Sequence, residues 1–178
     1  MSNYLDYIIH LSFAQWLGIA VFFLGILVFY QRNDKRFKII MVILNLTYML
    51  HFYLLGSPIS ALSSFIAACR TATSIFINSA YVAFAFVAVA VGFGLYISDH
   101  WWSLFPIVGT ATGTIALFLL TGIKMRLVML FGSVCWMTNN IIVGSIGGVL
   151  LESTVMTMNI ITIFRLLKAH AVERSVTH

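Results

Sequence analysis

Charged side chains are scarce in this sequence, where Asp, Glu, Lys and Arg together make up only 8% of 178 residues. A typical soluble domain carries about a quarter charged residues. Hydrophobic residues instead account for 61% of the chain. A globule of this size must present a largely polar face to water, and this sequence has too few polar residues to build one. The shortage of charge therefore excludes a water-soluble domain and predicts a surface that mostly contacts lipid.

Cysteine and the common catalytic motifs are also scarce. Cys69 and Cys135 each lie inside an apolar run, which excludes a disulfide-based scaffold. The chain has no zinc-binding HExxH helix, no GxSxG elbow, no phosphate-binding glycine loop and no paired aspartates within an apolar run. His51 has no second ligand at metal-binding spacing on the same run. We therefore expect no enzyme, no metal and no cofactor.

Linkers and polar domains are missing as well. There is no low-complexity, Pro-rich or Ser-rich segment. The segment before the first apolar run has no basic region and contains Asp6, so we expect that run to be a membrane span and not a cleaved signal peptide. The function is expected to reside in the membrane bundle itself.

The apolar runs that remain predict an all-α, polytopic membrane protein. A helix needs about 20 apolar residues to cross the hydrocarbon core of a bilayer. Seven stretches come near this length. Asn78 and Ser79 separate the third from the fourth, which would together be far too long for one span. The predicted spans are residues 12–30, 39–55, 59–77, 80–97, 103–120, 127–143 and 147–164.

The basic residues test this map independently, because cytoplasmic loops collect Lys and Arg. With seven alternating spans, nine of the ten basic residues fall on one side, and the opposite connections contain none. We therefore predict a periplasmic N-terminus and a cytoplasmic C-terminus. A net charge of +5 that arises from loops predicts no nucleic-acid partner. The nine residues are Arg32, Lys35, Arg36, Lys38, Lys124, Arg126, Arg165, Lys168 and Arg174.

The chain also resembles itself when it is shifted by 88 positions without a gap. The shift aligns the basic segment 36–38 with 124–126, Gly56-Ser57 with Gly144-Ser145, and residues 75–76 with 163–164. Span four then acts as a spacer that leaves both halves in the same orientation, as in parallel transporter repeats. We predict a first triple-helix repeat (1–79), a linker helix (80–100), and a second triple-helix repeat with a cytoplasmic tail (101–178).

Two ionisable residues lie inside predicted spans. Arg70 either extends its guanidinium to the cytoplasmic headgroups or meets a charge partner or substrate anion inside the bundle. Glu152 is a candidate partner, although it lies about 9 Å nearer the outer face along the helix axis. Without that partner, Glu152 is either protonated or faces a wet cavity. It then acts as a proton-coupled or cation-binding carboxylate, or forms a structural bond between helices.

Four further polar residues occupy equivalent positions in the two halves. Asn159 aligns with Thr71, which would place both at a central substrate site; the alternative is that they only join neighbouring helices. His51 aligns with Asn139 near the outer ends of spans two and six. Those two would either line an outer vestibule or bond the nearby Gly-Ser turns.

Several stretches resemble the bacterial inner-membrane YgjV family. They are residues 32–38 (RNDKRFK), 51–56 (HFYLLG), 70–71, 158–159 and above all 140–152 (NIIVGSIGGVLLE). The resemblance covers essentially the whole chain. It implies a location in the bacterial inner membrane and supplies no substrate.

The predicted plan is more distantly similar to the SWEET and PQ-loop group, in which two triple-helix bundles clasp a central cavity. That similarity implies a 3+1+3 fold with Asn159 and Thr71 facing a substrate. The prolines found in the first and second helices of each repeat of the sugar carriers are absent here. Pro106, at the start of span five, is the nearest counterpart.

These observations predict a small-solute transporter of the bacterial inner membrane with a central cavity lined by Arg70, Thr71, Glu152 and Asn159. The alternative is a receptor or scaffold that binds without transport. The expected partners are the lipid bilayer and a small polar solute. Exposed small-residue faces also permit a homodimer.

Overall fold

A computed structural model describes residues 12–31, 33–77 and 79–176, and the secondary structure of this part of the chain consists of helices joined by short connections. It contains seven α-helices and one short 3-10 helix, η1 (Trp101–Ser103). The predicted all-α fold is confirmed. The helices are α2 (Phe13–Tyr30), α3 (Asp34–Leu54), α4 (Pro58–Thr73), α5 (Ala80–Ile97), α6 (Leu104–Leu119), α7 (Gly122–Ile142) and α8 (Ile146–Val176).

Five of these helices, α3, α5, α6, α7 and α8, are long and apolar enough to cross a membrane. Helix α2 is apolar over a slightly shorter stretch, Phe13–Val28, and α4 has 16 residues. The chain is therefore a multi-span membrane protein. The expectations that involve Asp6, Arg32 and Asn78 lie outside the described residues.

The helix boundaries follow from local sequence. Asn33 caps α3 by accepting a hydrogen bond from the Arg36 backbone N–H at 3.1 Å, and Pro58 occupies the first turn of α4, where its missing N–H costs nothing. Both α3 and α7 contain 21 residues. Each ends before a glycine of positive φ, Gly56 (74°) or Gly144 (71°), where a side chain would be strained.

Four boundaries differ from the prediction. Helix α3 begins at Asp34, before residue 39, and α8 continues to Val176, beyond residue 164. Helix α4 ends at Thr73, before residue 77. Beyond this end, the Ser74 side chain donates to the Thr71 carbonyl. The Lys38 ammonium donates to the Ser74 carbonyl at 2.8 Å. Local bonds of this kind compete with helix continuation. Helix α7 begins at Gly122, so Arg126 lies within a helix and not in a loop.

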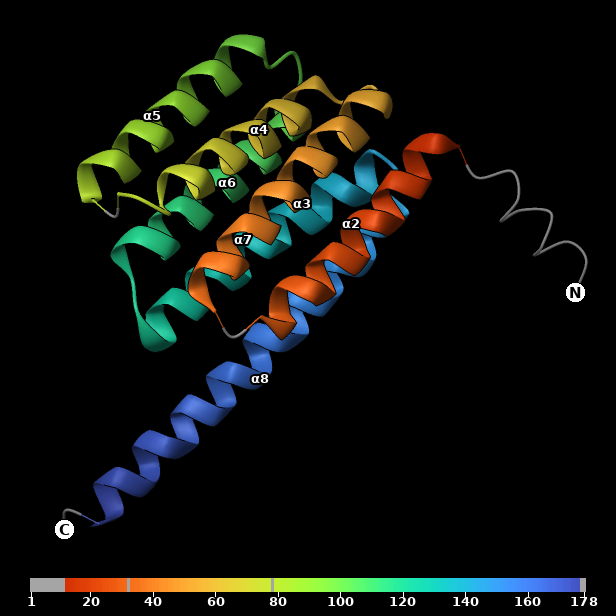
Figure 1. Ribbon diagram of the computed structural model, residues 1–178. Helices are drawn as coiled ribbons and strands as arrows, with labels where there is room; N and C mark the ends of the chain where they lie inside the picture. Colours follow the sequence, from red (N-terminus) through yellow and green to blue (C-terminus); the bar gives the residue numbers. More distant parts are fainter. Residues whose placement is uncertain (1–11, 32, 78, 177–178) are drawn as a thin grey trace, which may run out of the picture.

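The helices form two groups that pack into one bundle (Figure 1). Helix α3 packs against α2 and α4, and α7 packs against α6 and α8. The groups meet where α2 packs along α8 and where α4 packs along α6. Helix α5 covers one edge of the bundle beside α6, and the C-terminal part of α8 extends beyond it.

The interior of the bundle contains more polar side chains than the core of a typical water-soluble protein. Buried side chains include Ser60, His51, Thr114 and Asn140, whereas large apolar side chains such as Phe84 and Phe93 on α5 are exposed. This distribution suits a surrounding solvent of lipid, in which polar groups must find partners inside the protein.

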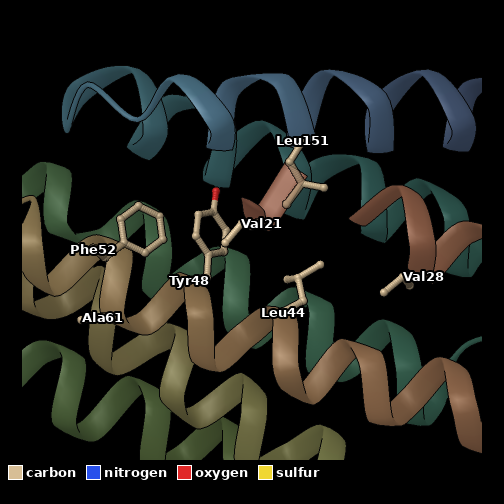
Figure 2. Close-up of a cluster of buried hydrophobic side chains, with 7 residues drawn as sticks. All are labelled: Val21, Val28, Leu44, Tyr48, Phe52, Ala61 and Leu151. Carbon is tan, nitrogen blue, oxygen red and sulfur yellow. The ribbon is translucent and has the colours of Figure 1, made fainter. Parts of the chain in front are cut away.

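One apolar cluster joins α2, α3 and α8 and includes Ala61 from α4. Val21 and Val28 from α2, Leu44 and Tyr48 from α3, and Leu151 from α8 meet there (Figure 2). The Tyr48 ring stacks on Phe52 at a centroid separation of 4.3 Å. Its hydroxyl extends away from α3 toward α7 and α8 (Figure 2), so the same residue belongs to the apolar core and to the polar interior.

Candidate solute-binding cavity

A cavity of about 430 Å³ lies between the two groups of helices. Its wall includes residues from six helices, namely α2, α3, α4, α6, α7 and α8, and none from α5. Cavities of a few hundred cubic ångströms at such junctions are typical of small-molecule sites.

The cavity occupies one half of the bundle. Gln31, Phe37, Met125 and Arg126 line it near the α2–α3 and α6–α7 connections, the connections that carry basic residues. Deeper along the same helices, Tyr48 and Trp136 line it with their rings stacked at a centroid separation of 6.0 Å. We call the half beyond these rings the closed end, because no lining residue lies there.

Arg70 lies inside the bundle with only 5% of its surface exposed. Its Nη1 donates to Thr114 Oγ1 on α6 at 3.0 Å, whereas its Nε has no partner among the described residues. Thr114 in turn donates to the Thr110 carbonyl at 2.7 Å. A Cβ on Gly113 would sit 3.5 Å from Arg70 Nη1, an ordinary van der Waals distance, so the guanidinium lies against α6 at this glycine.

Glu152 is 7% exposed and lines the same cavity from α8. The Ser133 hydroxyl on α7 lies beside its carboxyl group, and Tyr48 on α3 lines the same cavity. Within the described part of the chain, no ion pair joins Arg70 to Glu152. The two ionisable side chains line one cavity without forming a salt bridge.

Asn159 and Thr71 lie in different places. Asn159 lines the cavity, donates to the Val155 carbonyl at 3.0 Å and accepts a long bond from Arg126 Nη1 at 3.4 Å. Thr71 donates to the Ala67 carbonyl at 2.7 Å and lines a neighbouring pocket of about 280 Å³. Arg70 lines both spaces, as do Phe37, Met41 and Leu117.

His51 lies in the closed end and is fully buried. Its Nδ1 is 2.6 Å from the Ala14 carbonyl and its Nε2 is 2.7 Å from Ser145 Oγ. A carbonyl can only accept, so Nδ1 carries the proton and, in the neutral ring, Ser145 donates to Nε2. The Ser145 oxygen also accepts from the Gly148 N–H at 3.0 Å. His51 thus bonds the Gly-Ser turn of the other helix group.

Asn139 on α7 forms a second hydrogen bond between the two helix groups, with a residue of α4. Its Oδ1 accepts from Ser60 Oγ at 2.8 Å, and Ser60 also bonds Ser57 in the first Gly-Ser turn. Neighbouring Asn140 accepts from the Tyr48 hydroxyl at 2.9 Å. The closed end is therefore held by direct hydrogen bonds between the two helix groups, and neither His51 nor Asn139 lines the cavity.

Sequence reasoning missed several lining residues, among them Arg126, Ser64, Thr110 and Trp136. One signal was available on α7, where Arg126, Met129, Ser133 and Trp136 recur at three- and four-residue intervals, the spacing of one helix face. Ser64 and Thr110 gave no signal, since single hydroxyls are frequent in apolar helices. Across the described residues, no group of three or more His, Cys, Asp or Glu side chains could hold a metal ion.

Two comparisons with known proteins give a match. The model of a family described as bacterial inner membrane protein, Imp-YgjV, matches residues 12–170. The inner membrane protein YgjV of Escherichia coli (strain K12) is 36% identical over 152 residues, which cover 85% of this chain and 83% of that protein. No solved structure matches this chain.

Proposed function

We propose that this chain, which belongs to the Imp-YgjV family of bacterial inner membrane proteins, carries a small solute across that membrane. The observation that supports this most is the cavity of about 430 Å³ between the two helix groups. It contains Arg70, Arg126 and Glu152, ionisable residues that are rare inside membrane helices and mark substrate or ion pathways.

Similar local features in the two proposed repeats support the same proposal. Helices α3 and α7 are equal in length, and each leads through a positive-φ glycine to the helix that follows. The backbone N–H of Ser57 bonds the Phe52 carbonyl, and that of Ser145 bonds the Asn140 carbonyl in the same pattern. In this proposal, residues 1–79 and 101–178 are parallel repeats joined by residues 80–100, a 3+1+3 plan similar to that of the SWEET group.

The proposed topology has seven spans, with α2 and α4 crossing together with the five longer helices. The basic residues then lie at the cytoplasmic side, the N-terminus is periplasmic and the C-terminus is cytoplasmic. The cavity faces the cytoplasm, and the closed end faces the periplasm. This is one of the two states that a carrier needs, because alternating access requires a site closed to one side at a time.

A screen for ligand-dependent stability tests the proposal. Purified protein in detergent is heated in the presence of sugars, nucleosides, amino acids and organic acids. A solute at about a hundred times its dissociation constant should stabilise the fold by roughly 2.7 kcal/mol. We expect at least one solute class to raise the melting temperature.

Two variants show whether such a solute occupies the cavity. Ala67 is buried and lines the cavity, so Ala67→Phe fills it and should abolish the effect of the solute while the protein still folds. Ala85 is exposed on α5, and Ala85→Phe adds the same ring to the lipid-facing surface and should preserve the effect. A solute effect that survives in Ala67→Phe would contradict a cavity site.

A receptor that binds in the same cavity without transport is the second candidate. The direct bonds of His51 to Ala14 and Ser145 favour it, since they hold the closed end together. A receptor binds its ligand without turnover, so flux separates the two functions. Neither candidate is an enzyme, and the homodimer that the sequence permits stays a prediction.

A further inference from the structure

Three polar atoms on one wall of the cavity have no hydrogen-bond partner among the described residues. They are Ser64 Oγ and Arg70 Nε on α4 and Thr110 Oγ1 on α6. Their side chains are 1%, 5% and 3% exposed. Helices α4 and α6 pack against each other, so we call these three residues the donor wall. Native proteins leave few buried polar groups unpaired, and each such group requires an explanation.

The three donor-wall atoms lack a hydrogen-bond acceptor in the described part of the chain. A guanidinium has only N–H donors, and a hydroxyl without a neighbour can donate freely. The adjacent Thr114 accepts from Arg70 Nη1 and donates to the Thr110 carbonyl, but it bonds none of the three unpaired atoms. A bound group with several acceptor oxygens would satisfy all three positions.

The charges around the cavity favour a negative group. Arg70 and Arg126 line it from α4 and α7, and Glu152 lines it from α8 beside Ser133. The described residues include no ion pair that neutralises Arg70. A buried cation without a counter-ion is costly, and a ligand that supplies the opposite charge removes that cost.

The remainder of the wall is mainly apolar. Leu44, Met129, Trp136 and Val155 surround the space that the polar residues leave. A volume of about 430 Å³ exceeds the needs of chloride or another simple inorganic anion. The occupant should therefore combine an anionic head with an apolar body.

We propose that the donor wall binds the carboxylate of a small organic acid, with Arg70 as its ionic partner, Ser64 and Thr110 as hydrogen-bond donors, and Trp136 against its apolar body. This proposal rests on the carrier function and specifies the class of solute. Glu152 lines the same cavity from α8, which contributes no residue to the donor wall.

A series of probes with one ring and different head groups tests the proposal. Benzoate, benzamide and benzylamine are compared by thermal stability and by equilibrium binding to the purified full chain, together with butyrate, laurate and chloride. We expect carboxylates to bind and benzamide, benzylamine and chloride not to bind. Binding of benzoate or butyrate would identify the ligand as a water-soluble acid. Binding of laurate alone would identify the ligand as a lipid with the same carboxylate head group.

Variants of the donor wall distinguish binding from folding. Arg70→Gln should weaken carboxylate binding by about 10-fold or more, and Ser64→Ala and Thr110→Val by roughly 3- to 10-fold each. Both smaller changes remove an unpaired buried polar atom, so the unliganded protein should melt at the same temperature or higher. Thr112→Val is the matched control, because Thr112 bonds the Val108 carbonyl of its own helix and does not line the cavity.

Equal binding of benzoate and benzamide, no response to any carboxylate, or full affinity in Thr110→Val would each overturn the proposal. Counterflow with the same probes separates it from the carrier function. Flux of a neutral or cationic solute alone refutes only the carboxylate site, and carboxylate binding without flux refutes only the carrier.

Discussion

At the scale of single residues, two glycines let α2 and α8 approach closely enough to form the closed end. A Cβ on Gly147 would overlap the backbone of Gly18, and a Cβ on Gly18 would lie 2.7 Å from His51 Cε1. Small residues at such crossings are common in membrane helices, where association depends on van der Waals contact. Here the close approach also brings Ala14 and Ser145 within reach of one imidazole ring.

The first prediction concerns this helix crossing. Gly147→Ala should destabilise the protein by about 1–3 kcal/mol, because the new methyl group meets backbone that cannot rotate away. Unfolding in detergent measures the effect. Gly92→Ala on α5 is the control, since nothing lies within 4 Å of its Cβ position, and it should be neutral or stabilising by up to about 1 kcal/mol. Equal behaviour of the two variants would contradict the close approach.

The second prediction concerns the imidazole. His51→Ala should reduce the free energy of unfolding by about 2–4 kcal/mol, because it leaves the Ala14 carbonyl and Ser145 without their buried partner and opens a cavity. His100→Ala provides the comparison, since His100 is exposed and only stacks on Trp102; its effect should stay within about 0.5 kcal/mol. If His51 lined an outer vestibule instead, His51→Ala would lower the free energy of unfolding only slightly.

At the scale of helices, the sequence predicted the elements well and their ends less well. Apolar runs bounded by basic or Gly-Ser segments correspond to α2–α8, because a membrane helix must be apolar over most of its length. Polar residues at an end were harder to assign. Arg126 is compatible with both loop and helix, and only the structure places it in α7.

The cavity could be predicted only in part. Arg70, Glu152 and Asn159 line it, and their rarity within apolar runs had singled them out. Thr71 lies in the neighbouring pocket, and Ser64 and Thr110 were missed. These helices are apolar on nearly every side, so hydropathy does not identify the face that turns inward. That face depends on how α4 packs on α6 and how α8 packs on α2.

The third prediction concerns the direction of the helices. In a chain with Cys69→Ala and Cys135→Ala, a cysteine at Asp99 should react with a membrane-impermeant thiol reagent only from the periplasm. A cysteine at Thr121 should react only from the cytoplasm. Asp99 precedes α6 and Thr121 precedes α7, and both are exposed, so each reports one end of the bundle. The reverse pattern would invert the proposed topology.

At the scale of the whole molecule, the two ends of the bundle differ in kind. One end has hydrogen bonds that cross between the helix groups through His51, Ser60 and Asn139. The other end contains the cavity and two arginines that line it. A carrier must break the first set of bonds to expose the cavity to the periplasm. A receptor can keep them throughout its cycle.

The most direct test of the carrier account is therefore the accessibility of the cavity from each side. In the same cysteine-free chain, Ala67→Cys places a thiol on the cavity wall, and the cysteines at Asp99 and Thr121 report reagent leakage. The carrier account predicts fast labelling of Ala67→Cys from the cytoplasm and slower, complete labelling from the periplasm as the closed end opens. Labelling from the cytoplasm alone, with the Asp99 cysteine fully labelled from the periplasm, would contradict alternating access and favour the receptor.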